Sequence, residues 1–463
     1  MGISRRNFIK SSTTAAGLML AGQAPVYAAP KSTKAIVGNI KPSKKSMVFI
    51  MLDGGNDSFN MLVPTSAPHY REYKKTRSNL ALDKSSLLPL SNFKTPDGKQ
   101  FGVHESMDEV QQLFEEKRLA FVANTAPMIE PVSKQKFYSN QLKLPLGLMS
   151  HSDQFKHWQT GRPGERINRG WFGYFADSIQ KNKAIDEIPM NISLAGNNIM
   201  QNGHLAAPYS ITKSGSVGLY INEESTPLNE QLLEHFVKSL NANYPGDPFK
   251  DSYLAITRES QAQHEVFRDA VQNIKINTRF SDSDLSQQLR KVAQSIKAAD
   301  KLHHKQQTFF LRYIGWDHHD ELLDSHARML KVLSQALGEF QQSLDELGVA
   351  DQVVTFTGSD FGRTLTSNGN GTDHGWGGNT IVMGNSVNGG KVFGGYPALS
   401  LGDENPLDIG DGVLIPTTAI DALYAELAVW FGATRSQTHD LFPNLSNFSP
   451  IDSQPRLAGL MNY

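Results

Sequence analysis

Apolar and polar positions follow two patterns along the chain, and these separate predicted strands from predicted helices. Largely apolar runs, typical of strands buried on both faces of a parallel sheet, lie at 47–52, 119–124, 307–315 and 352–358. Apolar residues spaced three and four apart predict one amphipathic helix that begins near Met107 and a longer one over 321–348 that ends at Gly348. Because strands and helices follow one another in turn, the pattern favours an α/β fold with a mainly parallel sheet.

The remaining segments indicate how the chain is organised around this core. From about 180 to 300 the pattern is less regular, and we interpret this region as an insertion or cap packed on the same core. Residues 29–46 are rich in lysine and have no sustained period, which is typical of a linker or an edge strand. We therefore expect a single domain over 47–450, followed by a C-terminal tail over 451–463.

The N-terminus has the pattern of an export signal. "SRRNFIK" contains the pair Arg5–Arg6, a short apolar stretch follows, and "VYA" ends at Ala28 as a small-x-small cleavage site. A membrane anchor is the alternative, but a span needs about 20 apolar residues and this stretch is shorter. We expect residues 1–28 to be a twin-arginine signal peptide that is recognised by the export machinery. Cleavage would leave a periplasmic or extracellular protein without a stable membrane span.

Charge and cysteine content exclude several classes of function. The chain has 463 residues with 45 basic and 46 acidic side chains, so its near-neutral charge gives no sign of a nucleic-acid or anionic-membrane partner. It contains no cysteine. Disulfides, thiolate metal ligands, a cysteine nucleophile and a cysteine-derived formylglycine are therefore excluded.

Polar residues that can bind metals follow several of the predicted strands. They are Asp53, Asn56 and Asp57 after the first strand, Asp317, His318 and His319 in "WDHHD", Asp360 and Arg363 in "SDFGRT", and Asp373 and His374 in "TDHGWGG". Ligands in open α/β sheets bind beyond the carboxyl ends of the strands, so we expect these groups to share one site. Oxygen and imidazole ligands without thiolate suit zinc or manganese, and also magnesium or calcium.

Each of these motifs also has a simpler structural explanation. An aspartate after a strand is often a turn residue or a helix cap. The histidines of "DHHD" fit an exposed helix start, and Arg363 fits a structural ion pair.

The stretch "SHSDQFKHWQTG" allows two interpretations of Ser150. In the first, Ser150 caps the helix that follows, with Asp153 at the third helical position. In the second, Ser150 is a nucleophile activated by a metal ion. The residues alone favour capping.

Six motifs together resemble a known family. "DGGNDSFNMLVP", "SHSDQFKHWQTG", "GWFG", "GWDHHD", "SDFGRT" and "GTDHGWGG" occur in the order typical of the bacterial family of unknown function numbered 1501. That family is a twin-arginine-exported branch of the alkaline phosphatase/sulfatase-like superfamily. The resemblance spans about residues 45–450 and implies a doubly wound sheet with one or two divalent metal ions, commonly zinc or manganese, at its carboxyl edge.

The resemblance also implies roles for individual residues. Ser150 matches the nucleophile, and Arg363 or a backbone N–H is expected to steady the oxygens of the substrate. The matching metal ligands are Asp53, Asp317, His319, Asp360 and His374. The residues expected to orient these ligands or to contact the substrate are Asn56, Asp57, His151, His318 and Asp373.

The sequence departs from the phosphatase pattern at three points. Phe361 stands where phosphatases usually have a histidine, and Asp317 and His319 are two residues apart instead of four. Ser150 also lacks the Cys/Ser-x-Pro-x-Arg context of formylglycine conversion.

Two hypotheses about function remain. One is an exported metal-dependent hydrolase that acts on small anionic phosphate or sulfate esters. The other is a metal-stabilised binding or assembly protein of the cell envelope that has lost the chemistry.

Overall fold

The computed structural model describes residues 44–179, 187–218, 226–242, 244, 246–450 and 457–463. The predicted signal peptide and nearly all of the predicted linker lie outside these residues. Lys45 and Ser46, which we assigned to the linker, instead begin a strand at the centre of the sheet.

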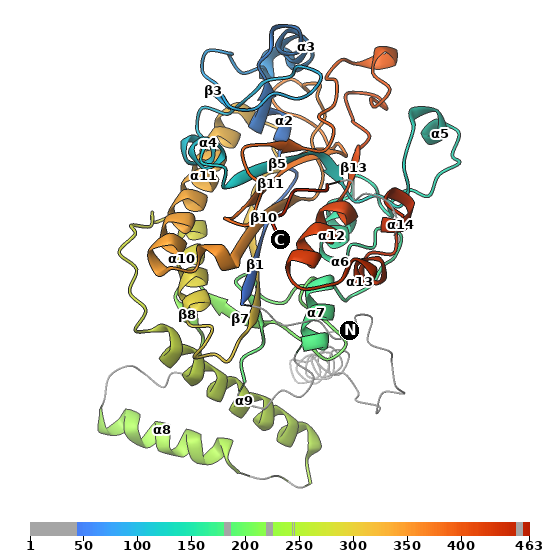
Figure 1. The fold of residues 1–463 in the computed structure, drawn as a ribbon. Helices are drawn as coiled ribbons and strands as arrows, with labels where there is room; N and C mark the ends of the chain where they lie inside the picture. The colour runs from blue at the N-terminus through green and yellow to red at the C-terminus, as the bar shows by residue number, and fades with distance from the viewer. Residues whose placement is uncertain (1–43, 180–186, 219–225, 243, 245, 451–456) are drawn as a thin grey trace, which may run out of the picture. The chain divides into compact units, whose positions relative to one another are not determined.

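A ten-stranded sheet forms the core of the domain, and its strands β1, β10, β11 and β5 can be followed in Figure 1. Its strands, in spatial order, are β12 (Val392–Phe393), β5 (Leu119–Ala126), β11 (Gly378–Met383), β10 (Val353–Ser359), β1 (Lys45–Asp53), β9 (Gln306–Ile314), β6 (Asn191–Ser193), β7 (Tyr209–Thr212) and β8 (Gly215–Ser216), with β13 (Thr418–Ala419) beside β5. Only β11 and β8 run antiparallel to their neighbours. The mainly parallel α/β sheet predicted from the sequence is therefore confirmed.

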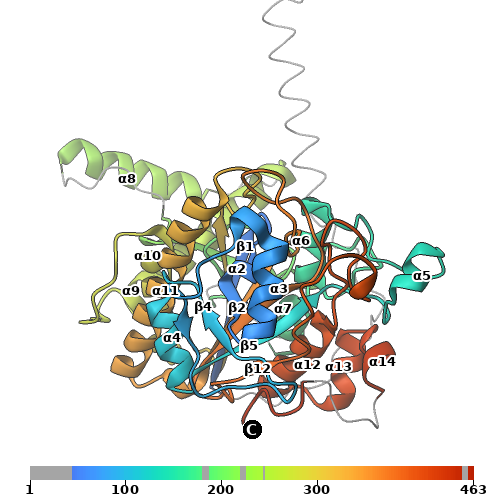
Figure 2. The same ribbon diagram turned by 90° about the horizontal axis from the view of Figure 1, so that it is seen from above.

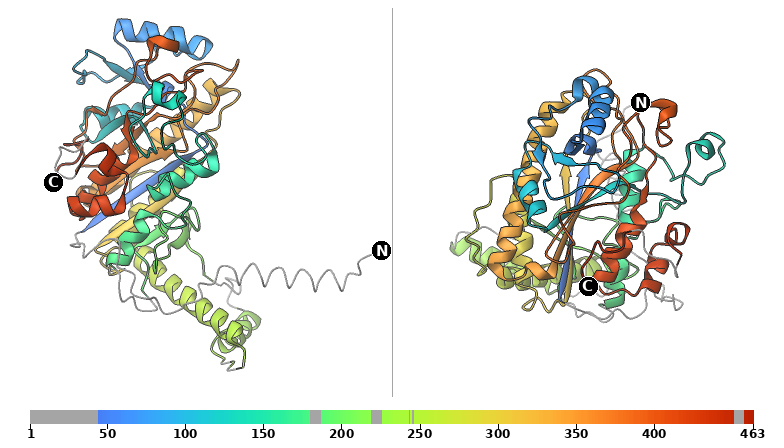
Figure 3. Two further views of the ribbon diagram at one scale, coloured as in Figure 1. Left: turned by 90° about the vertical axis from the view of Figure 1, so that its right-hand side faces the viewer. Right: turned by 45° about the horizontal axis from the view of Figure 1, so that its top comes forward.

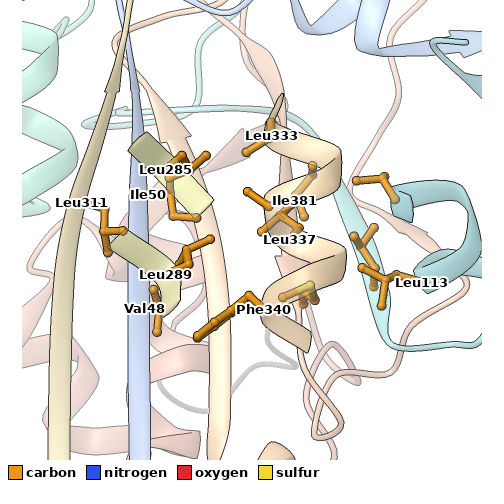
Figure 4. Packing of buried hydrophobic residues seen from close by; sticks show 14 of the residues in the cluster. Val48, Ile50, Leu113, Leu285, Leu289, Leu311, Leu333, Leu337, Phe340 and Ile381 are labelled. Carbon is orange, nitrogen blue, oxygen red and sulfur yellow. The ribbon is translucent and has the colours of Figure 1, made fainter. Parts of the chain in front are cut away.

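Helices cover both faces of this sheet (Figure 3). On one face lie α4 (Asp108–Glu115), α10 (Asp284–Lys297) and α11 (Leu322–Leu347). Figure 4 shows Leu333, Leu337 and Phe340 of α11 in the same buried cluster as Val48 and Ile50 of β1. Buried side chains that alternate to both faces explain why β1 has an unbroken apolar sequence.

Aromatic residues dominate the opposite face. Here lie α6 (His151–Thr160), α7 (Trp171–Ile179), α12 (Ile420–Trp430), α13 (Arg435–Leu441) and α14 (Leu445–Phe448). The ring of Trp171 stacks on Tyr424 with 4.8 Å between centroids, and Phe49 of β1 lies 4.9 Å from Phe356 of β10. Trp171 of α7 and Tyr424 of α12 both lie against Phe356, which packs these two helices on the sheet.

A smaller antiparallel sheet, β2 (Leu62–Pro64), β4 (Phe101–Val103) and β3 (Leu88–Pro89), follows the first strand of the core. It lies near α2 (Ser58–Met61) and α3 (Ala67–Arg77), as Figure 2 shows. The short helix α5 (Lys134–Tyr138) is part of the connection to α6.

The predicted insertion is smaller than expected. Within 180–300, β6 pairs with β9 in the central sheet and α10 packs on α11, so both belong to the core. Outside the core lie α8 (Pro227–Leu240) and the first part of α9 (Pro248–Val271), seen below the sheet in Figure 1, whereas Phe267, Ala270 and Val271 at the end of α9 belong to the buried core.

The described end of the predicted C-terminal tail belongs to the domain. Leu457 and Leu460 are buried, and the amide of Asn462 donates to the carbonyl oxygen of Ser386. Among the described residues, no helix combines the length and apolar character that crossing a bilayer requires.

Candidate metal centre

The carboxyl ends of three adjacent strands bring the polar motifs together. β1 lies between β9 and β10, with Asp53 opposite Ile314 and Leu52 opposite Ser359. The loops that follow these strands therefore leave the sheet at the same level. The start of α6 lies at this edge too, because His151 contacts Asp360, the residue that follows β10.

Four side chains meet there through their ligand atoms. Nε2 of His374 lies 3.1 Å from Nε2 of His151 and 3.1 Å from Nε2 of His319. The carboxylate of Asp317 lies 3.3 Å from Nε2 of His151, 3.0 Å from Nε2 of His319 and 3.5 Å from Nε2 of His374. Ligand atoms of His151, Asp317 and His374 all lie within 4.8 Å of one another, which is close enough to share one ion.

The outer nitrogen of each imidazole has an acceptor. Nδ1 of His374 is 2.9 Å from the carbonyl oxygen of Met149, and Nδ1 of His151 is 2.7 Å from Oδ2 of Asp360. Nδ1 of His319 is 3.2 Å from Oδ1 of Asp373. Only an N–H can donate to these oxygens, so in each neutral ring the proton sits on Nδ1 and the lone pair of Nε2 points into the cluster.

This arrangement fits a bound cation. Lone pairs of two imidazoles that face each other at 3.1 Å repel unless a positive charge lies between them. Three such lone pairs and one carboxylate form a donor set typical of zinc and also suited to manganese. Outer hydrogen bonds to a carbonyl and two carboxylates are the usual supports of metal-binding histidines.

Two of the four groups have a lowered pKa, which favours the deprotonated form that can bind a metal ion. Burial lowers the pKa of His374, which keeps this imidazole neutral. For Asp317, burial acts to raise the pKa, but the hydrogen bond and charge of Arg363 outweigh it and the pKa is lowered. The hydrogen bond to Asp360 raises the pKa of His151, so a metal ion would compete with a proton there.

Arg363 holds Asp317 from the protein interior. Its Nη1 donates to Oδ1 of Asp317 at 2.5 Å, its Nε donates to Oγ1 of Thr372 at 3.1 Å, and its Nη2 donates to the carbonyl oxygen of Thr372. The side chain is completely buried. We expected Arg363 to steady substrate oxygens, but the structure places it behind the cluster, where it orients a ligand.

Two acids expected as ligands lie outside the four-residue cluster. Asp53 forms an ion pair with Arg312 of β9, whose Nε donates to Oδ2 at 2.8 Å. Asp360 contacts the cluster only through His151, and its Oδ2 also accepts from the amide of Gly54 at 3.2 Å. Both acids therefore already have a nitrogen donor of the protein as partner.

Three further predicted residues form a buried layer next to the site. Oδ1 of Asn56 accepts from Nε2 of His326 at 2.8 Å, and Asp57 forms a fully buried ion pair with Arg77. His318 is buried, and desolvation lowers its pKa to about 4. These residues support the loops and do not join the cluster.

Ser150 stands immediately before His151 of the cluster. It occupies the N-cap position of α6, but its side chain accepts no capping hydrogen bond, and its Oγ lies 3.3 Å from Oγ of Ser152. The preceding Met149 has a φ of +65°, a left-handed conformation that costs energy in a residue with a side chain. This turn aims the carbonyl of Met149 at His374 and the ring of His151 into the cluster.

Phe361 fills the position that differs from the phosphatase pattern. Its ring centroid lies 4.8 Å from that of His151 and 4.5 Å from that of His374. An aromatic ring thus packs beside two of the ligands, where it offers no donor atom.

Comparison with known proteins gives little beyond the family. No curated protein matches the chain. Among solved structures, Ps i-CgsB in complex with k-i-k-neocarrahexaose is 12% identical, with 88% of this chain and 77% of that chain covered and a TM-score of 0.33. The PH0037 protein from Pyrococcus horikoshii is 12% identical (74% and 86% covered, TM-score 0.27), and the lipoteichoic acid synthase LtaP from Listeria monocytogenes is 9% identical (80% and 71% covered, TM-score 0.26).

Likenesses at this level carry no argument about function. The family comparison is more extensive, because its match runs from the first central strand past all the polar motifs of the site. Over residues 44–415 the chain matches the family described as "Protein of unknown function (DUF1501)", and it belongs to that family.

Proposed function

We propose that this protein is an exported hydrolase of phosphate or sulfate esters that depends on one divalent metal ion. The observation that carries the proposal is the convergence of three Nε2 atoms and one carboxylate in a cluster that is open to solvent. The four side chains, those of His151, Asp317, His319 and His374, are between 29% and 45% exposed. A purely structural ion is usually enclosed, whereas a substrate must be able to reach a catalytic one.

The donor set supports one ion, with zinc or manganese as the best candidates. A second ion would need several further ligands. Oδ1 of Asp360 is buried and has no hydrogen-bond partner among the described residues, but Asp53 is neutralised by Arg312 and Phe361 provides no ligand atom, so we propose one ion.

Ser150 is the nucleophile in this proposal. Ser150 lies between Met149, whose carbonyl oxygen accepts from His374, and His151, whose Nε2 is part of the cluster. Its hydroxyl is therefore on the same short segment as two residues that contact His374. Its Oγ would form the bond to phosphorus or sulfur while the alcohol leaves, and water would later release the inorganic acid. A bound divalent ion would supply Lewis-acid stabilisation of charge at the ester oxygens.

A second candidate function rests on the number of ligands. Four protein side chains are enough to complete a tetrahedral shell, and a closed shell is typical of structural zinc. In that case the protein is a metal-stabilised binding or assembly protein of the cell envelope.

Hydrolysis of p-nitrophenyl phosphate and p-nitrophenyl sulfate by metal-loaded protein separates the two candidates. We expect Ser150→Ala to lower kcat by at least about a thousandfold without loss of metal. Ser152→Ala is the matched control, because its hydroxyl lies 3.3 Å from that of Ser150 and carries no assigned role. A loaded wild type that hydrolyses neither ester would overturn the hydrolase proposal in favour of the second candidate.

A further inference from the structure

Arg312 is a partly exposed cation at the carboxyl edge of the sheet. It lies near the end of β9, where the strand emerges from the core, and pairs in register with Met51 of β1. Its Nε and Nη2 both donate to Oδ2 of Asp53. No described residue accepts a hydrogen bond from its Nη1.

A short series of contacts connects Arg312 to the metal centre. Asp53 is followed by Gly54, whose amide donates to Oδ2 of Asp360 at 3.2 Å, and the same oxygen lies 2.7 Å from Nδ1 of His151. The guanidinium of Arg312 also lies 4.9 Å from the centroid of the Phe155 ring. Phe155 follows His151 by one turn of α6, so both project from the same side of that helix.

The two arginines near the centre differ in what they are free to bind. Arg363 is fully buried, with donors on all three of its nitrogens bound to Asp317 and Thr372. The side chain of Arg312 is 37% exposed. Stacking on Phe155 and the ion pair with Asp53 hold the guanidinium in one orientation, which lowers the entropy cost of binding a ligand.

We propose that Arg312 binds the non-bridging oxygens of an anionic ester at the metal centre, and that Asp53 is the positioning residue that holds it there. The inference rests on the proposed function and names its substrate class as tetrahedral oxyanions. Guanidinium donors suit phosphate and sulfate oxygens, and the ion pair with Asp53 leaves the Nη1 donors of Arg312 for such a ligand.

The test measures binding, not turnover. Inorganic phosphate and, separately, inorganic sulfate are titrated by calorimetry into metal-loaded wild type, Arg312→Ala and Arg312→Lys. We expect Arg312→Ala to weaken binding of the preferred oxyanion tenfold or more, the size typical of one lost hydrogen bond to a charged group, and Arg312→Lys to weaken it less. Metal content should stay unchanged in all three.

Arg118→Ala is the matched control. Arg118 is also partly exposed and paired with an aspartate, Asp345, but it lies at the amino end of β5, away from the centre. Its variant should bind like wild type.

Two results would overturn the inference: equal binding by Arg312→Ala and wild type, or no binding of either oxyanion by wild type. Measuring ester turnover distinguishes a failure of this inference from a failure of the proposed function. If wild type hydrolyses an ester and Arg312→Ala does so with an unchanged KM, the inference fails while the hydrolase stands. If phosphate or sulfate binds through Arg312 but no ester is cleaved, the hydrolase fails instead.

Discussion

Outer contacts determine the proton positions of the three histidines in the cluster. Each imidazole is held by a different kind of acceptor: a backbone carbonyl for His374, the buried Asp360 for His151 and the exposed Asp373 for His319. Asp373 therefore provides the support that the sequence suggested for it, but to His319 and not to its neighbour in the chain. The path of the loops decides which imidazole ring each aspartate contacts. The spacing of residues along the sequence does not reveal that path.

Buried Asp421 leads to a prediction about pH. It lies in the first turn of α12, neither carboxyl oxygen has a hydrogen-bond partner among the described groups, and burial raises its pKa to about 8. In the unfolded chain an aspartate ionises near pH 3.9, so between about pH 4 and pH 8 unfolding releases a proton. Rising pH should therefore lower the free energy of unfolding across this window.

The variant Asp421→Asn removes the titrating group at nearly constant volume. Urea unfolding at pH 5.5 and pH 8.5 should show a larger loss of stability in wild type than in the variant. Equal losses in both proteins would show that Asp421 does not keep its proton.

At the scale of elements, the buried strands were predictable and the irregular ones were not. β1, β5, β9 and β10 are apolar because both faces of each strand are covered, and α11 ends as expected at Gly348, which has a φ of +67°. The two-residue strands have too few positions to show a period. The predicted insertion included too many residues. It took in β6, which pairs directly with β9 but is only three residues long and so shows no apolar pattern.

The candidate site was predictable in location but not in composition. Polar residues after adjacent parallel strands must meet at one edge, and Asp317, His319 and His374 do so. Two contacts decide the rest: Arg312 pairs with Asp53, and the turn at Met149 directs His151 inward. The first joins residues 259 positions apart, and the second is a left-handed backbone conformation at a methionine, so no local sequence pattern predicts either. The Ser-His pair at the start of α6 was the available signal for His151.

Packing of α7 gives a prediction at the level of one element. Gly173 in "GWFG" lies against the loop at Asn202, and a Cβ atom there would stand 2.0 Å from the carbonyl oxygen of Asn202. Gly173→Ala should therefore destabilise the protein by about 1–3 kcal/mol, the usual cost of overpacking. Gly246→Ala is the control, because nothing lies within 4 Å of its added Cβ. Chemical denaturation of the two variants checks this, and a Gly173→Ala protein as stable as wild type would contradict it.

At the scale of the whole molecule, the proposed metal centre depends on the complete domain. The candidate ligands come from the start of α6, the loop after β9 and the loop before β11, and the supporting residues Asp360 and Arg363 follow β10. Segments more than 200 residues apart must therefore meet before an ion can be held.

Metal content of protein purified without chelator, measured by plasma mass spectrometry, tests the central claim most directly. We predict close to one equivalent of zinc or manganese in wild type, lost in Asp317→Ala and His374→Ala but retained in Asp53→Asn, because Asp53 binds Arg312 and not the ion. No metal in wild type even after reconstitution, or two equivalents of which Asp53→Asn loses one, would contradict the account.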